Sequence, residues 1–215
     1  MKHVRNLFAA LMMVFAAHAL AQSEGGAEYT PLEPAQPTHT GKKIEVLEFF
    51  YYGCPHCFAM HPKLTAWEEK MPQDVQLDFV PVAFGDNQLP MAYAFYSLKT
   101  MRDLNKISAA QFKQLHEKLY EALNVQRLNL NDMDKIADFV AQQGVDRSEF
   151  VKNYTSYFVR TKVEQSRQMT VRYQISGTPT VVVEGKYMIS PLQPDDTIRV
   201  LNQLIDKVRK ERGKH

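Results

Sequence analysis

The sequence predicts an α/β fold in which a long helical segment interrupts a region of strands. An apolar, strand-like run at Ile44–Tyr52 leads directly into a helical pattern that begins at Pro55. Further strand-like runs return only after Gly177. Between these regions apolar residues recur at i, i+3 and i+4, the spacing of amphipathic helices. Hydrophobic residues make up 45% of the 215 residues, which is enough for a substantial core.

The N-terminus has the pattern of a secretory signal peptide. Lys2 and Arg5 precede the apolar run Leu7–Ala17, and the segment ends in Ala-Leu-Ala at Ala21. A charged start, an apolar centre and a small-residue cleavage site define such peptides. A membrane anchor fits less well because spanning a bilayer takes about 20 apolar residues. We therefore expect residues 1–21 to be a signal peptide cleaved near Ala21.

The next part of the chain predicts a strand, a helix and a second strand. Residues 22–43 are rich in Ser, Gly, Pro and Thr and indicate an exposed lead-in, with an edge strand near Glu28–Leu32. The β-forming residues of Ile44–Tyr52 predict a buried strand. A helix is expected from Pro55 to about Met71, since proline suits the first helical turn. The run Val75–Phe84 predicts the second strand.

The middle of the chain predicts helices, and its end predicts a hairpin and one more helix. Ser108 and Asn131 are plausible N-caps, because their side chains can accept hydrogen bonds from unpaired backbone N–H groups. The expected helices are Leu89–Met101, Ala109–Leu123, Met133–Gln143 and Ser148–Tyr173. The expected later elements are strands Thr180–Val183 and Tyr187–Ile189, a turn at Glu184–Lys186 and a final helix, Pro194–Arg212.

The charge balance argues against a polyanionic partner. The chain has 26 Lys and Arg against 24 Asp and Glu, a formal net charge of +2. Lys2 and Arg5 would leave with the signal peptide, so the mature chain is formally neutral. A nucleic-acid-binding protein usually carries a clear positive excess. We therefore expect no nucleic acid among its partners.

The only two cysteines, Cys54 and Cys57, are separated by two residues at the expected strand-to-helix junction. Export makes a structural disulfide conceivable, because exported proteins are oxidised. However, a bond that closes so short a loop would constrain the unfolded chain very little. A helix N-terminus, in contrast, lowers the pKa of a thiol and makes it reactive. The pair therefore predicts redox chemistry.

Together these features resemble the periplasmic disulfide oxidases of the DsbA family. The motif Cys54-Pro55-His56-Cys57 follows the strand residues Val46–Phe50, Glu28–Glu33 is similar to the family's first strand, and Thr178-Pro179 precedes the later hairpin. The resemblance implies a thioredoxin-like fold interrupted by an inserted all-helical domain. The thioredoxin-like domain would comprise residues 44–87 and 175–215, and the insertion residues 88–174.

The resemblance also implies the roles of the site residues. Cys54 would be the exposed nucleophile and Cys57 the shielded resolving thiol, with a mixed disulfide forming at Cys54. His56 could donate a hydrogen bond to the thiolate, and Pro55 would start the helix. The bond between Thr178 and Pro179 would be cis, leaving the Thr178 backbone free to pair with an extended substrate. No cofactor beyond the Cys54–Cys57 disulfide is implied.

Three further residues near the motif have open or secondary roles. Glu48 is either a buried carboxylate that exchanges a proton with Cys57 or a residue at a solvated strand end. Relatives with a lysine near this acid would carry it where this chain has Phe79, so a carboxylate–lysine relay would lack its base. Tyr52 is expected in an apolar substrate-binding rim. His61 could join the two cysteines in a metal site, but a structural zinc needs four ligands, so we expect no metal.

These features predict a monomeric periplasmic enzyme that donates its disulfide to newly exported, unfolded, cysteine-containing proteins. The resemblance implies reoxidation by a quinone-linked membrane partner. A reductase or isomerase of the same fold is the first alternative, although an isomerase would normally need a dimerisation domain larger than residues 22–43. A peptide-binding or chaperone module with an incidental dithiol is the second alternative.

Overall fold

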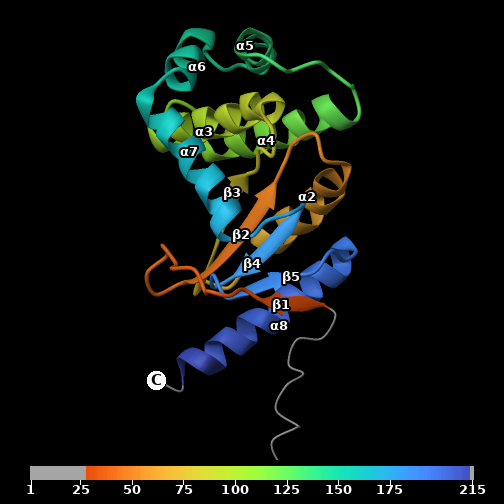
Figure 1. Cartoon of the computed structure of the whole chain (residues 1–215). Helices are drawn as coiled ribbons and strands as arrows, with labels where there is room; N and C mark the ends of the chain where they lie inside the picture. The colour runs from red at the N-terminus through yellow and green to blue at the C-terminus, as the bar shows by residue number, and fades with distance from the viewer. Residues whose placement is uncertain (1–27, 214–215) are drawn as a thin grey trace, which may run out of the picture.

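The computed structural model describes residues 28–213 and has a mixed sheet with helices on both faces and at one end (Figure 1). The predicted signal peptide lies outside these residues. The five strands are β1 (Tyr29–Pro31), β2 (Ile44–Phe50), β3 (Val75–Pro81), β4 (Thr180–Val183) and β5 (Tyr187–Ile189). The helices are α2 (Pro55–Glu68), the 3-10 helix η2 (Asp86–Gln88), α3 (Leu89–Asp103), α4 (Ala109–Asn124), α5 (Met133–Gln142), α6 (Arg147–Tyr154), α7 (Tyr157–Arg172) and α8 (Pro194–Arg212).

The strand order is β1-β5-β4-β2-β3, with β2 and β3 parallel and every other pair antiparallel. All seven residues of β2 are buried, as expected for a strand covered on both faces. Ile44 and Val46 pack against α2 and α8, whereas Leu47 and Phe49 pack against residues that follow α7. Because side chains alternate along a strand, Glu48 lies on the α2 side of the sheet.

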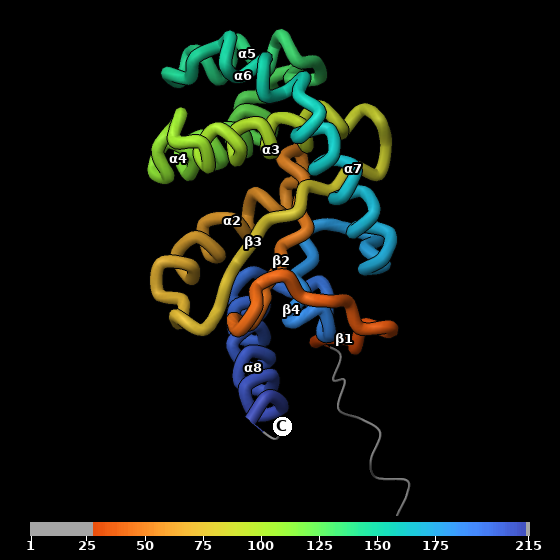
Figure 2. The backbone as a smooth tube through the Cα atoms, turned by 90° about the vertical axis from the view of Figure 1, so that its left-hand side faces the viewer, coloured from red at the N-terminus to blue at the C-terminus, as the bar shows by residue number. Residues whose placement is uncertain are grey.

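Helices α3–α6 gather at the end of the molecule opposite α8, as the two perpendicular views show (Figures 1 and 2). Their apolar faces form one core that continues to the active-site end of β2, where it includes Phe50, Tyr52 and Cys57. The predicted redox motif therefore lies between this helical group and the sheet. No helix within residues 28–213 is long and apolar enough to cross a bilayer.

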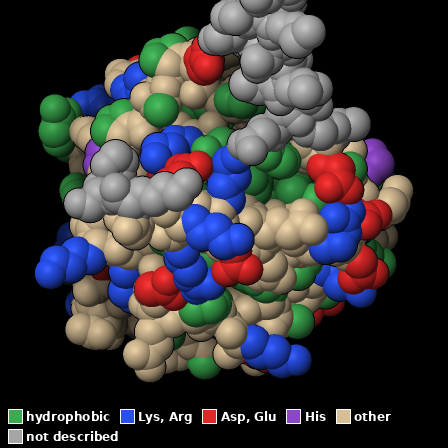
Figure 3. Space-filling model, turned by 90° about the horizontal axis from the view of Figure 1, so that it is seen from below, with side chains coloured by type: hydrophobic (Ala, Val, Ile, Leu, Met, Phe, Trp, Pro, Cys, Tyr) green, Lys and Arg blue, Asp and Glu red, His purple; other side chains and the backbone are tan. Residues whose placement is uncertain are grey.

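The face seen from below carries Lys and Arg interspersed with Asp and Glu (Figure 3). Ion pairs also join residues of α8 to other segments. Arg209 contacts Asp74 at 2.8 Å, and Arg199 contacts Glu28 at 2.5 Å. On the described part of this face, charges of both signs thus lie close together.

Most of the predicted elements are confirmed. The first two main strands end earlier than predicted, at Phe50 and Pro81, and the helix predicted to begin at Pro55 ends at Glu68. Ser108 caps α4 by accepting a hydrogen bond from the Gln111 N–H, as predicted. The N-cap of α5 is Asp132 and not Asn131, because the Asp132 carboxylate accepts from the Lys135 N–H.

The prediction of one helix over Ser148–Tyr173 is wrong. The structure has α6 and α7, with a break between Tyr154 and Tyr157. Ser156 ends the continuity because its hydroxyl accepts from the Val159 N–H and starts a new helix. Serine and threonine favour helix N-caps over helix interiors, so their presence at this point indicates the break. The apolar periodicity continues across it and led to the wrong prediction.

Candidate active site

A tight turn between β2 and α2 places Cys54. The Cys54 N–H donates to the Tyr51 carbonyl at 3.0 Å, and the Cys54 carbonyl accepts from the Phe58 N–H at 3.0 Å. Cys54 is thus the N-cap residue of α2, and Pro55 occupies the first turn as predicted. At Gly53 an added Cβ atom would lie 2.6 Å from the Tyr51 ring, so that ring would have to move if a larger residue replaced the glycine.

The two cysteines occupy very different environments. Cys54 is partly exposed, and its pKa is lowered to about 5, chiefly by a hydrogen bond from the Cys57 thiol. The backbone N–H groups of Cys57 and His56 at the start of α2 also lower it, against the opposing effect of burial. Cys57 is fully buried, and burial raises the pKa of its thiol. At neutral pH the reduced pair therefore holds a thiolate at Cys54 and a thiol at Cys57.

His56 is exposed on the first turn of α2, beside the reactive sulfur. Its backbone N–H is among the groups that stabilise the Cys54 thiolate. Among the hydrogen bonds of the described residues, none joins its ring to that sulfur. The predicted contribution of the imidazole to thiolate stabilisation therefore remains a prediction.

Glu48 is buried, and the alternative of a solvated strand end is wrong. Its side chain has 0% exposure, and neither carboxylate oxygen has a hydrogen-bond partner in the described part of the chain. Burial, reinforced by the negative charge at Cys54, raises the pKa of Glu48 to about 8. At neutral pH this carboxyl group therefore holds a proton near the dithiol.

The loop before β4 brings a third segment to the site. The Thr178–Pro179 peptide bond is cis, as predicted. The Cys54 Sγ lies 3.2 Å from the Thr178 carbonyl oxygen, so the loop touches the reactive sulfur directly. Both loop residues are partly exposed, so this segment lies at the surface beside Cys54.

A model of the DSBA-like thioredoxin domain matches residues 45–201. The chain belongs to this family. It is 38% identical over 206 residues to the thiol:disulfide interchange protein DsbA of Pseudomonas syringae pv. tomato, covering 94% of this chain and 92% of that protein. It is 33% identical over 214 residues to the DsbA of Pseudomonas aeruginosa strain PAO1, covering 96% and 98%.

Solved structures agree with this assignment. The crystal structure of Pseudomonas aeruginosa DsbA superposes with a TM-score of 0.79 at 32% identity, covering 86% of this chain and 94% of that one. Reduced DsbA1 from Neisseria meningitidis gives 0.79 at 26% identity, covering 91% and 100%. The predicted interrupted thioredoxin-like fold is confirmed. As a member of the DsbA family the protein is a thiol–disulfide oxidoreductase.

The sequence led us to expect Phe79, and no lysine, near the Glu48 carboxyl group. Phe79 lies opposite Glu48 in the parallel pairing of β2 and β3. Its ring packs against Phe50 and His116. The neighbouring acid, Asp78, is paired with Lys99. The residue paired with Glu48 is therefore aromatic and carries no positive charge.

Tyr52 does not belong to a substrate-binding rim, so that prediction is wrong. The side chain is 1% exposed, and its hydroxyl lies 2.6 Å from Nδ1 of His116 on α4. Asn124, at the end of the same helix, donates from Nδ2 to the Tyr52 carbonyl at 2.7 Å. Sequence analysis missed both partners, because neither residue is near the motif in the chain. Met60 and Trp67 are buried core residues.

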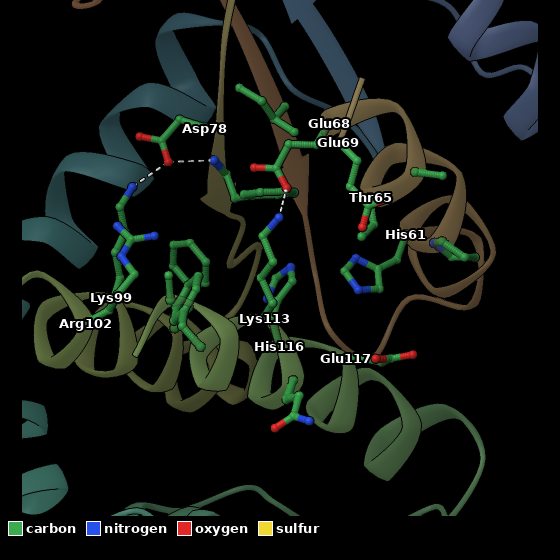
Figure 4. Close-up of a pocket in the computed structure, with 18 residues that line it drawn as sticks. His61, Thr65, Glu68, Glu69, Asp78, Lys99, Arg102, Lys113, His116 and Glu117 are labelled. Carbon is green, nitrogen blue, oxygen red and sulfur yellow. Dashed lines mark hydrogen bonds and ion pairs between the residues drawn. The ribbon is translucent and has the colours of Figure 1, made fainter. Parts of the chain in front are cut away.

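A pocket of about 460 Å³ lies beside this region, between α2, β3, α3 and α4 (Figure 4). His61 and His116 form part of its wall, with ring centroids 4.9 Å apart. Burial lowers the pKa of His61 to about 4 and that of His116 well below its usual value, so both rings are neutral at neutral pH. No group of three or more metal-ligating side chains occurs within residues 28–213.

Proposed function

We propose that this protein acts as an oxidase, donating a Cys54–Cys57 disulfide to newly exported, unfolded proteins in the periplasm. The difference between the two thiols is the observation that carries the proposal. A thiol whose pKa is about 5 favours the reduced, thiolate form, and a couple with a stabilised reduced form is a strong oxidant. Partial exposure of Cys54 and full burial of Cys57 favour attack at Cys54.

The reaction would proceed through a mixed disulfide. A substrate thiolate attacks the Cys54 Sγ, forming a substrate–Cys54 bond and breaking the Cys54–Cys57 bond. Cys57 leaves as a thiolate, takes up a proton and becomes a buried thiol. A second substrate thiolate then attacks the substrate sulfur of the mixed disulfide, and Cys54 leaves as a stabilised thiolate. The substrate is oxidised by two electrons and the enzyme is reduced by two.

Glu48 is suited to supply the proton that Cys57 takes up. Its carboxyl is protonated at neutral pH because its pKa is about 8. When ionised, Glu48 also helps to raise the pKa of the Cys57 thiol, so the carboxyl group lies within electrostatic reach of that sulfur. A thiolate formed at Cys57 in this buried place would be a stronger base than Glu48, and the proton would move to it.

The cis Thr178–Pro179 loop would hold the substrate. An extended peptide can pair with exposed main chain, as in strand addition to a sheet edge. The contact between Cys54 and the Thr178 carbonyl would bring such a peptide beside the reactive sulfur. Pro55 and the exposed His56 would border the same surface.

The remaining assignments follow from the family and the sequence. The enzyme would need no cofactor beyond its disulfide, and a quinone-linked membrane partner would reoxidise it. Residues 1–21 would direct export and be removed near Ala21. We assign residues 44–87 and 175–215 to a thioredoxin-like domain and 88–174 to the helical insertion, in a monomeric protein.

Equilibration with glutathione tests the direction of the reaction. The fraction of protein with a Cys54–Cys57 bond is measured against the ratio of reduced to oxidised glutathione. An oxidase should be almost fully reduced where thioredoxin is largely oxidised. A potential near that of thioredoxin would contradict the proposal. Cys54→Ser should abolish oxidation of a reduced, unfolded substrate, whereas a chaperone with an incidental dithiol would keep its activity.

A further inference from the structure

Tyr52 lies in the turn Tyr51–Cys54, called here the catalytic turn. One ridge of helix α4 contacts its carbonyl group, its ring and its hydroxyl group. The ridge consists of His116, Tyr120 and Asn124, which lie at successive i+4 positions and therefore on the same side of the helix. The His116 Nδ1 bonds the Tyr52 hydroxyl at 2.6 Å, and Asn124 donates to its carbonyl at 2.7 Å. The Tyr120 ring packs between these two contacts, edge-on to the Tyr52 ring with centroids 5.0 Å apart.

Asn124 binds the one peptide group of the turn that can rotate most easily. Tyr51–Cys54 is a four-residue turn closed by the hydrogen bond from the Cys54 N–H to the Tyr51 carbonyl. In such turns the central peptide group can rotate between two turn types while the closing bond is kept. Here the central peptide joins Tyr52 to Gly53, and its carbonyl is the one that Asn124 binds.

The orientation of that peptide bears on the reactive sulfur. Cys54 is the last residue of the turn and the N-cap of α2, so the turn sets where its Sγ lies relative to the N–H groups of His56 and Cys57 at the start of the helix. Those N–H groups are part of what stabilises the Cys54 thiolate. A turn free to change type would align the sulfur with them less of the time.

The hydroxyl contact holds the other end of the same residue. Burial keeps the Tyr52 hydroxyl protonated and the His116 imidazole neutral, so their hydrogen bond joins two neutral groups. His61 is the ionisable group whose charge bears on His116, and it too is neutral at neutral pH. The bond therefore persists over the pH range in which the enzyme would work.

We propose that Asn124 and His116 are positioning residues, which act through Tyr52 to hold the catalytic turn and thereby set how oxidising the Cys54–Cys57 pair is. The proposal rests on the proposed oxidase function. It makes the helical insertion a determinant of the redox equilibrium of the site, although no hydrogen bond within residues 28–213 joins either residue to a sulfur atom.

The first test replaces Asn124 and a matched asparagine. Asn153 on α6 donates to the Glu149 carbonyl at 2.8 Å, just as Asn124 donates to the Tyr120 carbonyl at 2.8 Å, but it lies on a helix away from the turn. Asn124→Ala should raise the pKa of Cys54 by about half a unit and shift the glutathione equilibrium about threefold toward the disulfide form. Asn153→Ala should leave both quantities unchanged, and Asn124→Gln, which keeps an amide donor, should recover part of the shift.

The second test removes the hydrogen bond between the Tyr52 hydroxyl and His116. It can decide the question even if Asn124→Ala does not fold. His116→Phe and Tyr52→Phe each remove the 2.6 Å bond while keeping a ring. Each should shift the glutathione equilibrium in the same direction as Asn124→Ala. The double variant should shift it no further than Tyr52→Phe alone, because the bond is already lost.

The proposal is overturned if Asn124→Ala shifts the equilibrium no more than Asn153→Ala does. It is equally overturned if His116→Phe and Tyr52→Phe have additive effects or none. A wild-type protein as reducing as thioredoxin would refute the oxidase function instead. In that case the differences between variants would still report on positioning.

Discussion

The Sγ atom of Cys54 lies 3.2 Å from the main-chain carbonyl oxygen of Thr178, across 124 positions of sequence. In the thiol form Cys54 donates a hydrogen bond to this carbonyl. In the thiolate form the sulfur is stabilised chiefly by the Cys57 thiol and by N–H groups at the start of α2. The reactive atom thus lies where a helix N-terminus and an accessible loop meet, and its protonation state has consequences for stability.

The reduced protein should be more stable than the disulfide form at pH 7. The pKa of Cys54 is about 5 in the folded protein. A free thiol has a pKa of about 8.5, so thiolate stabilisation is complete above that pH and is lost as the pH falls through 5. After allowance for solvent screening at a partly exposed group, we expect a difference of about 1–2 kcal/mol at pH 7.

Denaturant unfolding of both redox forms at pH 8, 7 and 5 measures this difference. Reduced Cys54→Ser protein is the control, since it has no thiolate to stabilise. A difference that stays constant or grows as the pH falls would rule out the thiolate as its cause.

Replacing Glu48 with glutamine should be more favourable to stability at neutral pH than at pH 4.5. The folded pKa of Glu48, about 8, lies above the ordinary value of 4.5. The fold therefore favours the protonated form. The pH-dependent part of the cost of burying this residue is absent below pH 4.5, grows as the pH rises and levels off above pH 8. We expect Glu48→Gln to gain about 1–3 kcal/mol at pH 7 relative to its effect at pH 4.5.

The measurement is the free energy of unfolding of the reduced protein across this pH range. The unpaired amide of the glutamine costs the same at every pH, so the slope with pH is the relevant quantity. Glu117→Gln, at an exposed position of α4, is the control and should leave the slope unchanged. A Glu48→Gln slope identical to wild type would mean that Glu48 does not retain its proton.

Alanine at Gly185 should destabilise the fold much more than alanine at Gly41. Both glycines have positive φ, +60° and +63°, so both substitutions carry the same backbone strain of about 1–2 kcal/mol. At Gly185 a Cβ atom would also lie 2.2 Å from the Gln36 carbonyl oxygen, whereas at Gly41 nothing lies within 4 Å. The clash would disturb the 2.8 Å bond from the Gln36 N–H to the Gly185 carbonyl.

Urea unfolding should therefore show an additional loss of about 2 kcal/mol or more for Gly185→Ala, the size of a steric and hydrogen-bond defect. Equal losses at the two positions would show that residues near Gln36 move aside freely.

Removing Arg212 should cost more stability than removing Arg209, although both lie on α8 and both bind a carboxylate. Arg212 bonds Glu184 at 2.6 and 3.1 Å, and the Glu184 side chain is only 10% exposed. Arg209 bonds Asp74, whose side chain is 50% exposed. Arg212→Ala would leave a nearly buried charge uncompensated, at a cost of about 3 kcal/mol. Arg209→Ala should cost about 1 kcal/mol or less.

Thermal unfolding of the two variants at low and high salt makes this comparison. Salt should reduce the effect of Arg209→Ala more than that of Arg212→Ala, since exposed pairs are screened more strongly. The prediction fails if the two variants lose equal stability.

The amino-acid sequence by itself determined the chemistry and most of the local structure. Two cysteines at a strand-to-helix junction, a proline in the first turn and a hairpin with Gly185 in its turn are local patterns, and each was found where predicted. Local hydrogen bonding also explains the errors. Asp132, and not the predicted Asn131, is the N-cap of α5. Ser156 is the N-cap of α7, so the segment for which apolar periodicity predicted one helix forms two.

Only the tertiary structure decided which groups surround the dithiol and whether they are buried. Glu48 was equally compatible with solvent and core until α2 covered its face of the sheet. Tyr52 looked like a substrate contact until His116 and Asn124, on a helix distant in sequence, enclosed it. Burial and hydrogen-bond partners are properties of contacts between distant segments. The motif therefore determines which reaction the protein performs, and the packing around it determines the protonation state of each group.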